Sequence, residues 1–196
     1  MNAPDSGEQD AHDMARLTAG HDAALNAIMD RHAERLFHYL LRQLNNETDA
    51  ADIAQETFVR IYHHRARFQP DQNFSTWLYT IATNLLRDRF RWRRRHPQVS
   101  LDAEDEDSAA LKDTLPDSAP SPSDQTDANE RAVEVRKAIA SLPDDLRTVV
   151  ILSEYDGLPH AQIASILKCS SKAVESRLYR ARAHLRQRLE SLLQLG

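Results

Sequence analysis

The sequence predicts an all-α protein. Only four of its 196 residues are glycine, and none lies between Gly20 and Gly157. Runs of the β-branched residues that favour strands are few, whereas apolar residues recur every three or four positions, as on one face of a helix. We therefore expect helices joined by polar or proline-marked turns.

The first half of the chain is predicted to contain three helices after a polar N-terminus. Residues 1–17 are expected to be disordered because few of them are apolar. Apolar residues then keep helical spacing from Leu25 to about Leu44. A second helix is predicted from Asp49 to about Arg67, with Thr48 or Asp49 as its N-cap. It carries an apolar face and, on another side, Asp49, Asp52, Gln55 and Glu56.

The third segment, residues 74–95 (FSTWLYTIATNLLRDRFRWRRR), combines a folding pattern with a binding pattern. Its apolar residues form one helical stripe, whereas its last third contains six arginines around Phe90 and Trp92. One or two cations would complement the dipole of a helix end, so six exceed that need. Arginines neutralise phosphates and aromatic rings stack on unpaired bases, so the segment indicates nucleic-acid binding.

Charge is unevenly distributed along the chain. Residues 97–130 contain ten acidic residues and one lysine, a net charge of −9, so the remainder carries +4 of the total of −5. Half of the prolines also lie in this stretch. Residues 97–128 are therefore predicted to be a flexible acidic linker between two basic domains.

The second half is predicted to contain two helices and then a helix-turn-helix. Apolar spacing resumes at residues 129–142, and Pro143 and Gly157 bracket the next helix. Residues 159–188 show two helical patterns separated by a short turn, with Ser170 as the N-cap of the second. As a recognition helix, the second would direct toward a major groove the residues Lys172, Glu175, Ser176, Tyr179 and Arg180.

Several other classes of function are disfavoured. Cys169 is the only cysteine, so neither an internal disulfide nor a cysteine zinc site can form. His63 and His64 point in different directions on a helix, and no metal site, cofactor site or catalytic constellation is recognised. There is no apolar run long enough to cross a bilayer and no signal peptide, so we expect a cytoplasmic protein.

Four sequence blocks, taken in order, resemble the extracytoplasmic-function (ECF) sigma factors of the bacterial sigma-70 family. The blocks are DAADIAQETFVRIYHHRARF, residues 74–95, LPDDLRTVVILSEYDGLPHAQIASIL and AVESRLYRARAHL. The resemblance covers about residues 20–96 and 129–190. It implies a sigma-2-like helical bundle at 18–96 and a sigma-4-like helix-turn-helix domain at 129–194. Core RNA polymerase, promoter DNA and an anti-sigma factor are the implied partners, and catalysis is left to the polymerase.

The resemblance also implies roles for individual residues. Asp49, Asp52, Gln55 and Glu56 match the surface that docks on the clamp helices of the largest polymerase subunit, and the C-terminal domain is expected at the flap region. The five outward residues of the recognition helix match the readers of the −35 element. Melting and capture of the −10 element are assigned to Phe68, Asn73, Trp77, Asn84, Arg87, Arg91 and Arg94.

Two features depart from the family pattern. Lys168 stands in the helix-turn-helix turn where glycine is common, and a left-handed lysine carries a conformational cost. Glu175 stands where a basic residue is common. Two other functions are alternatives for the same residues: a stand-alone helix-turn-helix transcription factor, and a nucleic-acid enzyme that uses His63 and His64.

Overall fold

The computed structural model describes residues 6–96 and 132–193, and these residues form helices and turns without a strand. The predicted all-α class is confirmed, whereas the predicted linker at 97–128 lies outside the described residues. In chain order the elements are α1 (Ser6–Thr18), α2 (Ala23–Leu44), α3 (Glu47–His64), the 3-10 helix η1 (Arg65–Arg67), α4 (Phe74–Arg95), a helix at 132–140, α6 (Asp144–Val150), the π-helix η3 (Ile151–Tyr155), α7 (His160–Leu167) and α8 (Ser171–Leu193).

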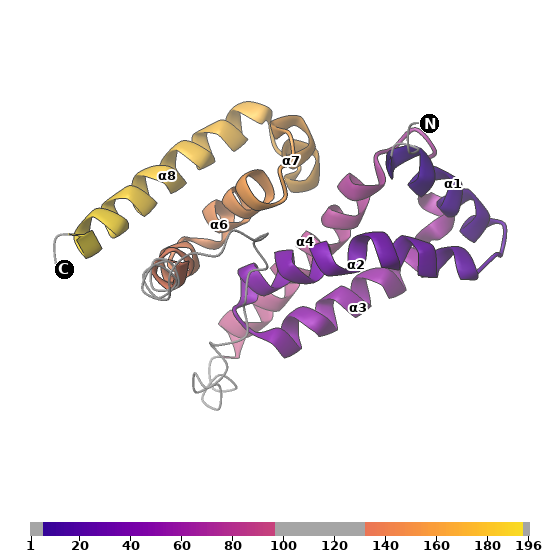
Figure 1. The fold of residues 1–196 in the computed structure, drawn as a ribbon, viewed down its shortest axis with the longest axis horizontal. Helices are drawn as coiled ribbons and strands as arrows, with labels where there is room; N and C mark the ends of the chain where they lie inside the picture. Colours follow the sequence, from indigo (N-terminus) through magenta and orange to yellow (C-terminus); the bar gives the residue numbers. More distant parts are fainter. Residues whose placement is uncertain (1–5, 97–131, 194–196) are drawn as a thin grey trace, which may run out of the picture.

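Helices α1 to α4 form one unit, called here the N-terminal bundle (Figure 1). Its core is made by the apolar stripes that the sequence predicted, because α2, α3 and α4 each turn one such stripe inward. Ile53, Phe58 and Ile61 are buried on α3, and Phe74 and Leu78 are buried on α4. Both ends of α4 agree with the prediction.

The N-terminus differs from the prediction, which was wrong for the described part of residues 1–17. Ser6–Thr18 forms α1, which packs against α2 and buries Met14 and Leu17 completely. Two apolar side chains are a weak sequence signal for a helix. The rest of the α1 contact is polar, and hydrophobic periodicity does not report buried acids.

The polar contact is a buried network between α1 and α2. Asp10 and Asp13 are each only 2% exposed. Arg31 donates through Nε to Asp10 at 3.0 Å and through Nη2 to Asp13 at 2.7 Å. His32 Nε2 lies 2.8 Å from Asp10 Oδ2, and its ring lies 5.0 Å from that of Phe74 at the start of α4. The network therefore fastens α1 beside the end of the bundle where α4 begins.

Replacement of Asp10 by alanine should lower the free energy of unfolding by about 3 kcal/mol, because it removes one partner of a buried charged pair. Urea unfolding followed by helical circular dichroism measures the loss. Glu8→Ala is the matched control, since Glu8 lies on the same helix and is exposed. Equal stability of the two variants would show that the buried network around Asp10 does not stabilise the fold.

The helix caps refine one further prediction. Asn46, rather than Thr48 or Asp49, is the N-cap of α3, and its Oδ1 accepts from the Asp49 backbone N–H at 2.8 Å. Either predicted residue has a suitable side chain, but the chain turns two residues earlier. Asn73 caps α4 in the same way, with its Oδ1 3.0 Å from Thr76 N.

Residues 132–193 form the second unit, called here the C-terminal bundle. The stretch RTVVIL is helical, as predicted, and Pro143 precedes α6 at the N-cap position. Gly157 ends this helical run with φ of +64°, a conformation that suits glycine. Helices α7 and α8 form the predicted helix-turn-helix. Val174, Leu178 and Ala181 of α8 are buried, and α8 packs against α6 and α7.

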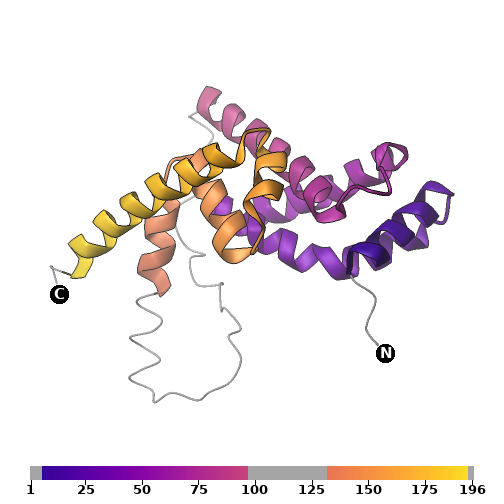
Figure 2. The same cartoon turned by 90° about the horizontal axis from the view of Figure 1, so that it is seen from above.

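The two bundles pack against each other. Helix α7 contacts α4, while α6 and η3 contact α2 (Figure 2). Arg147 of α6 donates to the backbone oxygen of Gln43 on α2 at 2.7 Å, although the two residues are 104 positions apart. Burial lowers the pKa of Arg147, and the nearby Asp144 carboxylate acts in the opposite direction. The buried apolar residues of the two bundles also form one continuous cluster, so the contact between the bundles is both polar and apolar.

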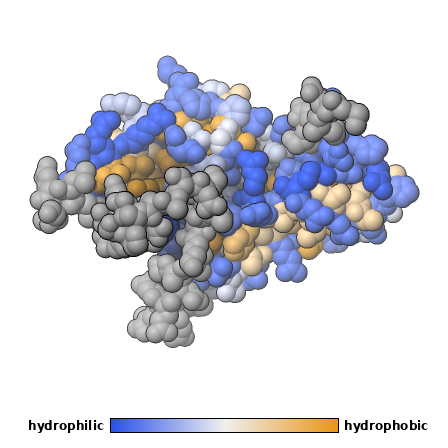
Figure 3. Space-filling view, in the orientation of Figure 1, coloured by the Kyte–Doolittle hydropathy of each residue, from blue (hydrophilic) through white to orange (hydrophobic). Residues whose placement is uncertain are grey.

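Hydrophilic residues cover most of the face seen in Figure 3, and hydrophobic residues show through in patches, one of them beside α8. Within the described ranges, no helix is both long enough and apolar enough to cross a membrane.

Candidate nucleic-acid interface

The arginine-rich end of α4 is divided between two faces. Arg89 and Arg93 both pair with Asp49 at the start of α3, on the side of α4 that packs into the bundle. Asp49 is 8% exposed, so this carboxylate is committed to the two guanidinium groups. Two of the six arginines therefore hold α3 and α4 together.

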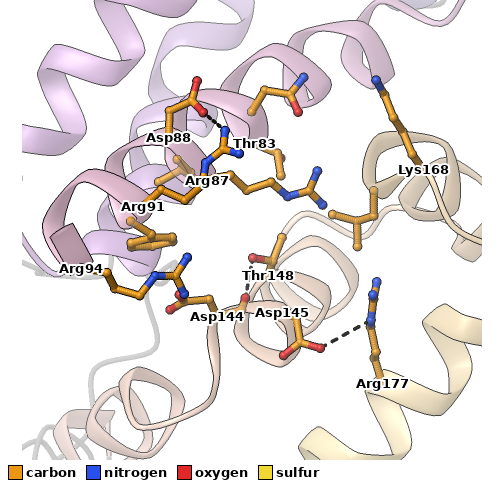
Figure 4. A pocket seen from close by; sticks show the side chains of 14 residues that line it. Thr83, Arg87, Asp88, Arg91, Arg94, Asp144, Asp145, Thr148, Lys168 and Arg177 are labelled. Carbon is orange, nitrogen blue, oxygen red and sulfur yellow. Dashed lines mark hydrogen bonds and ion pairs between the residues drawn. The ribbon is translucent and has the colours of Figure 1, made fainter.

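The opposite face of α4 carries the predicted −10 residues of this helix end. Asn84, Arg87, Arg91 and Arg94 recur at three- and four-residue intervals, which places them on one side of the helix. They line a cavity of about 640 Å³ (Figure 4). The structure thus brings together four of the seven residues predicted for the −10 element.

The other wall of the cavity comes from the C-terminal bundle. It contributes Asp144, Asp145 and Thr148 from α6, Lys168 from the helix-turn-helix turn and Arg177 from α8. The sequence did not place any of these five beside α4, because residues about 50 to 90 positions away in the chain give no sign that they will face it. The cavity forms only where the two bundles pack together, so it could not be predicted from either half of the sequence.

Some charges in the cavity are neutralised and others are available. Arg91 pairs with Asp88 on its own helix, and Arg177 lies 3.6 Å from Asp145. Among the described residues, three charged groups have no side-chain hydrogen bond or ion pair: the guanidinium groups of Arg87 and Arg94 and the ammonium group of Lys168. These three cations are the strongest candidates for contact with phosphate.

The remaining predicted −10 residues lie at the other end of α4. Phe68 and Trp77 are half-buried, with ring centroids 5.3 Å apart, and both pack near Phe74. Asn73 is exposed but uses its side-chain oxygen to cap the helix. Asn84 lies 11 residues further on, about 16 Å along the axis. A single strand would therefore have to follow α4 to meet both groups.

The helix-turn-helix presents its predicted reading face to solvent. The five residues predicted to read the −35 element are all exposed, and Tyr179 is 77% exposed. Ser170 caps α8, accepting from Ala173 N at 3.2 Å. Lys168 adopts the left-handed conformation, with φ of +54°, so the cost expected for a non-glycine residue is present.

The acidic surface predicted to dock polymerase is smaller than the sequence suggested. Asp52 and Gln55 are exposed on α3, and Glu56 is half-exposed and paired with Arg60 at 2.8 Å. Asp49 does not share this surface, because Arg89 and Arg93 hold its carboxylate. Among the described residues, no cluster of three or more His, Cys, Asp or Glu side chains could hold a metal ion.

One buried polar contact between the bundles was also not predicted from the sequence. Asp156, which follows η3, is 8% exposed, and its Oδ1 accepts from the hydroxyl of Tyr79 on α4 at 2.9 Å. Burial raises the pKa of Asp156 to about 6, although the Tyr79 hydrogen bond and Arg35 and Arg42 lower it. Burial likewise raises the pKa of Tyr79.

Comparisons with known proteins agree with this geometry. Residues 28–96 match the model of sigma-70 region 2, and residues 132–185 match that of sigma-70 region 4. The RNA polymerase sigma-H factor of Pseudomonas aeruginosa is 33% identical over 191 residues, which are 95% of this chain and 96% of that protein. The ECF RNA polymerase sigma factor SigW of Bacillus subtilis is 34% identical, over 90% of this chain and 95% of its own.

A solved structure shares the arrangement. The structure of CnrH in complex with the cytosolic domain of CnrY matches with a TM-score of 0.68 at 27% identity, over 93% of this chain and 98% of that chain. CnrH is an RNA polymerase sigma factor of Cupriavidus metallidurans. The two bundles correspond to regions 2 and 4, and the chain belongs to the ECF RNA polymerase sigma factors of the sigma-70 family.

Proposed function

We propose that the two bundles divide promoter recognition between them. The N-terminal bundle, with residues 18–96 as its limits, binds core polymerase and captures the −10 element. The C-terminal bundle, within residues 129–194, reads the −35 element. Residues 97–128 join them and set how far apart the two DNA contacts can lie.

The observation that carries the proposal is the division of the α4 arginines. Arg89 and Arg93 are held by Asp49, whereas Arg87 and Arg94 lie on the other face without a partner among the described residues. Folding needs the first pair and leaves the second free for phosphates. Asn84, on the same face, is placed to bond the edge of an unstacked base.

The two ends of α4 have different parts in strand capture. The Phe68–Trp77 pair offers aromatic surface at the start of the helix, and the arginines follow the phosphates toward its end. Strand separation loses base stacking in the duplex, and these contacts offset that loss. Such a protein contributes binding energy, while the polymerase supplies the catalytic chemistry.

The −35 element is read by the exposed face of α8. Lys172 and Arg180 supply donors for guanine edges or phosphates, and Glu175 can accept from a cytosine amino group. Glu175 also lies 3.9 Å from His160 at the start of α7, a distance that leaves it free to turn toward DNA. This face remains open while the bundles are packed together.

Core polymerase is proposed to dock on Asp52, Gln55 and Glu56 of α3. The flap region of the polymerase is proposed to contact the C-terminal bundle. Asp49 instead positions the α4 arginines. CnrH has been solved with the cytosolic domain of CnrY. By analogy we propose a protein partner of the anti-sigma type for this chain, and a cytoplasmic location, where core polymerase is found.

Run-off transcription tests the proposal as a whole. Purified protein added to bacterial core polymerase should yield discrete transcripts from a pool of genomic fragments, whereas core polymerase alone should not. A stand-alone transcription factor would bind its site without polymerase and would not direct initiation. Absence of any specific transcript with a folded protein would overturn the sigma-factor mechanism proposed for these residues.

A further inference from the structure

We propose that α1 is a positioning element for strand capture, because it holds in place the aromatic pair Phe68 and Trp77. It does so through two separate contacts with the rest of the N-terminal bundle. This inference rests on the proposed function, since it takes the two rings to be part of the −10 site. Helix α1 lies at one end of the bundle and precedes residues 28–96, which match sigma-70 region 2 (Figure 1). In this role no residue of α1 needs to touch DNA.

The aromatic pair is supported by a third, buried ring. Phe74, the first residue of α4, is 2% exposed. Its ring centroid lies 5.9 Å from that of Phe68 and 6.2 Å from that of Trp77. The rings of Phe68 and Trp77 are only half-buried, so each keeps a surface on which a base can stack. Close-packed side chains transmit displacements, so the position of Phe74 decides where this stacking surface lies.

The first contact runs from α1 through His32 to Phe74. His32 Nε2 lies 2.9 Å and 2.8 Å from the two carboxylate oxygens of Asp10 on α1. The carboxylate accepts and Nε2 donates, which fixes the orientation of the imidazole. That ring lies 5.0 Å from the ring of Phe74, at an interplanar angle of 51°. Arg31 also donates to Asp10, so the carboxylate that orients His32 is itself held in one place.

The second contact joins the end of α1 to the turn that precedes Phe68. The Thr18 hydroxyl lies 2.9 Å from the Met14 backbone oxygen and 3.3 Å from that of Arg65, so its single hydrogen is shared between the two carbonyls. The Arg65 oxygen also accepts from the Phe68 backbone N–H at 3.2 Å. Thr18 therefore bonds the same carbonyl that fixes the backbone of Phe68.

The two contacts act on the two sides of the aromatic pair. Thr18 acts on the backbone before Phe68, whereas His32 acts on the ring that supports both members of the pair. The loop of residues 69–73 between them is exposed throughout, so it contributes no buried side chain to hold the rings together. A binding surface has to be held to within about 0.5 Å to be effective. Helix α1 supplies that restraint from outside the loop.

Three variants of the full chain test this role. His32→Gln can still donate to Asp10 but has no ring to place against Phe74. Thr18→Val removes the shared hydroxyl from an exposed position, so this variant folds even if His32→Gln does not. Glu34→Gly is the matched control, because Glu34 is exposed on α2 and a glycine within a helix lowers stability without touching either contact. Urea unfolding followed by circular dichroism gives a temperature at which every variant is folded.

The fluorescence of Trp77 reports the position of the pair without DNA. For this measurement Trp92 is replaced by phenylalanine in every variant, so that Trp77 is the only tryptophan in the chain. We expect acrylamide to quench Trp77 more strongly in His32→Gln and in Thr18→Val than in the wild type, and Glu34→Gly to leave quenching unchanged. Wild-type quenching in both α1-contact variants would refute the positioning role. So would an equal increase in Glu34→Gly, because the signal would then follow stability alone.

Binding of DNA tests the consequence for strand capture. The probe is a fluorescent random-sequence single strand of about 20 nucleotides, since stacking on aromatic rings accepts every base. Trp77→Leu should weaken binding about tenfold and His32→Gln about fivefold, whereas Glu34→Gly should bind as the wild type does. In a protein that already carries Trp77→Leu, the change His32→Gln should weaken binding by less than about twofold, because both act through one surface.

The two single variants separate this inference from the proposed function. If Trp77→Leu weakens binding and a folded His32→Gln protein does not, α1 has no part in strand capture and the proposed function stands. If Trp77→Leu binds as the wild type does, the assignment of the aromatic pair to strand capture fails, and this inference fails with it. Losses that add fully in the double variant would show that His32 does not act through Trp77, which would also refute the positioning role.

Discussion

Charge reversal of Asp52 and Glu56 to lysine should weaken the binding of core RNA polymerase by about 30-fold or more. An acidic surface binds a basic partner, and replacing both acids turns attraction into repulsion within the interface, a change worth about 2 kcal/mol or more. Asp52 is exposed, and Glu56 can contact the polymerase once its ion pair with Arg60 is broken. The dissociation constant is measured by competition for labelled core polymerase.

The matched control for this prediction is the pair Asp30→Lys and Glu34→Lys. These acids are exposed on α2, so their reversal changes the net charge by the same amount on a neighbouring helix. We expect this variant to bind core polymerase nearly as well as the wild type at moderate salt. Equal losses for the two double variants would mean that net charge, and not the α3 surface, controls docking.

Removal of the outward-facing arginines of α4 should affect strand capture most strongly. The triple variant Arg87→Ala, Arg91→Ala and Arg94→Ala should reduce affinity for single-stranded −10 DNA, measured in the polymerase complex, by about 100-fold. Loss of about three phosphate contacts should also reduce the slope of log K against log salt by about two. Fluorescence anisotropy over a salt series gives both quantities.

The control uses the arginines on the other face of the same helix. Arg89→Ala and Arg93→Ala leave the buried Asp49 carboxylate without its partners, so these changes should lower the free energy of unfolding. The salt slope should remain that of the wild type at temperatures where the protein is folded. A slope that falls as much as in the triple variant would contradict the division of α4 into a packing face and a DNA face.

Much of the fold could be predicted from the sequence. The apolar stripe that begins at Phe74 gave the start and the buried part of α4, because a stripe that must be buried specifies where a helix is needed. Pro143 and Gly157 marked the limits of the helical run between them for local backbone reasons. Residues 6–17 were mispredicted because the contacts of α1 depend on buried acids that pair with Arg31 and His32 of α2.

The candidate site was predicted less completely. Asp49 shares helical spacing with Asp52 and Glu56, so the sequence grouped all three as one acidic surface. Spacing fixes which residues lie on one side of a helix, but it does not show which neighbouring helix will cover part of that side. In the fold, Arg89 and Arg93 reach Asp49 and leave the other two free.

The sequence by itself determined the helical class, the helix-turn-helix and the surplus of arginines at the end of α4, because each depends on residues that are close in the chain. Only the tertiary structure decided which arginines are free, where α1 packs, and that Asp144, Asp145 and Asp156 of one bundle meet α4 of the other. These outcomes depend on contacts between residues about 20 to 120 positions apart, in which burial changes the energy of a charge. Local sequence patterns contain no record of that burial.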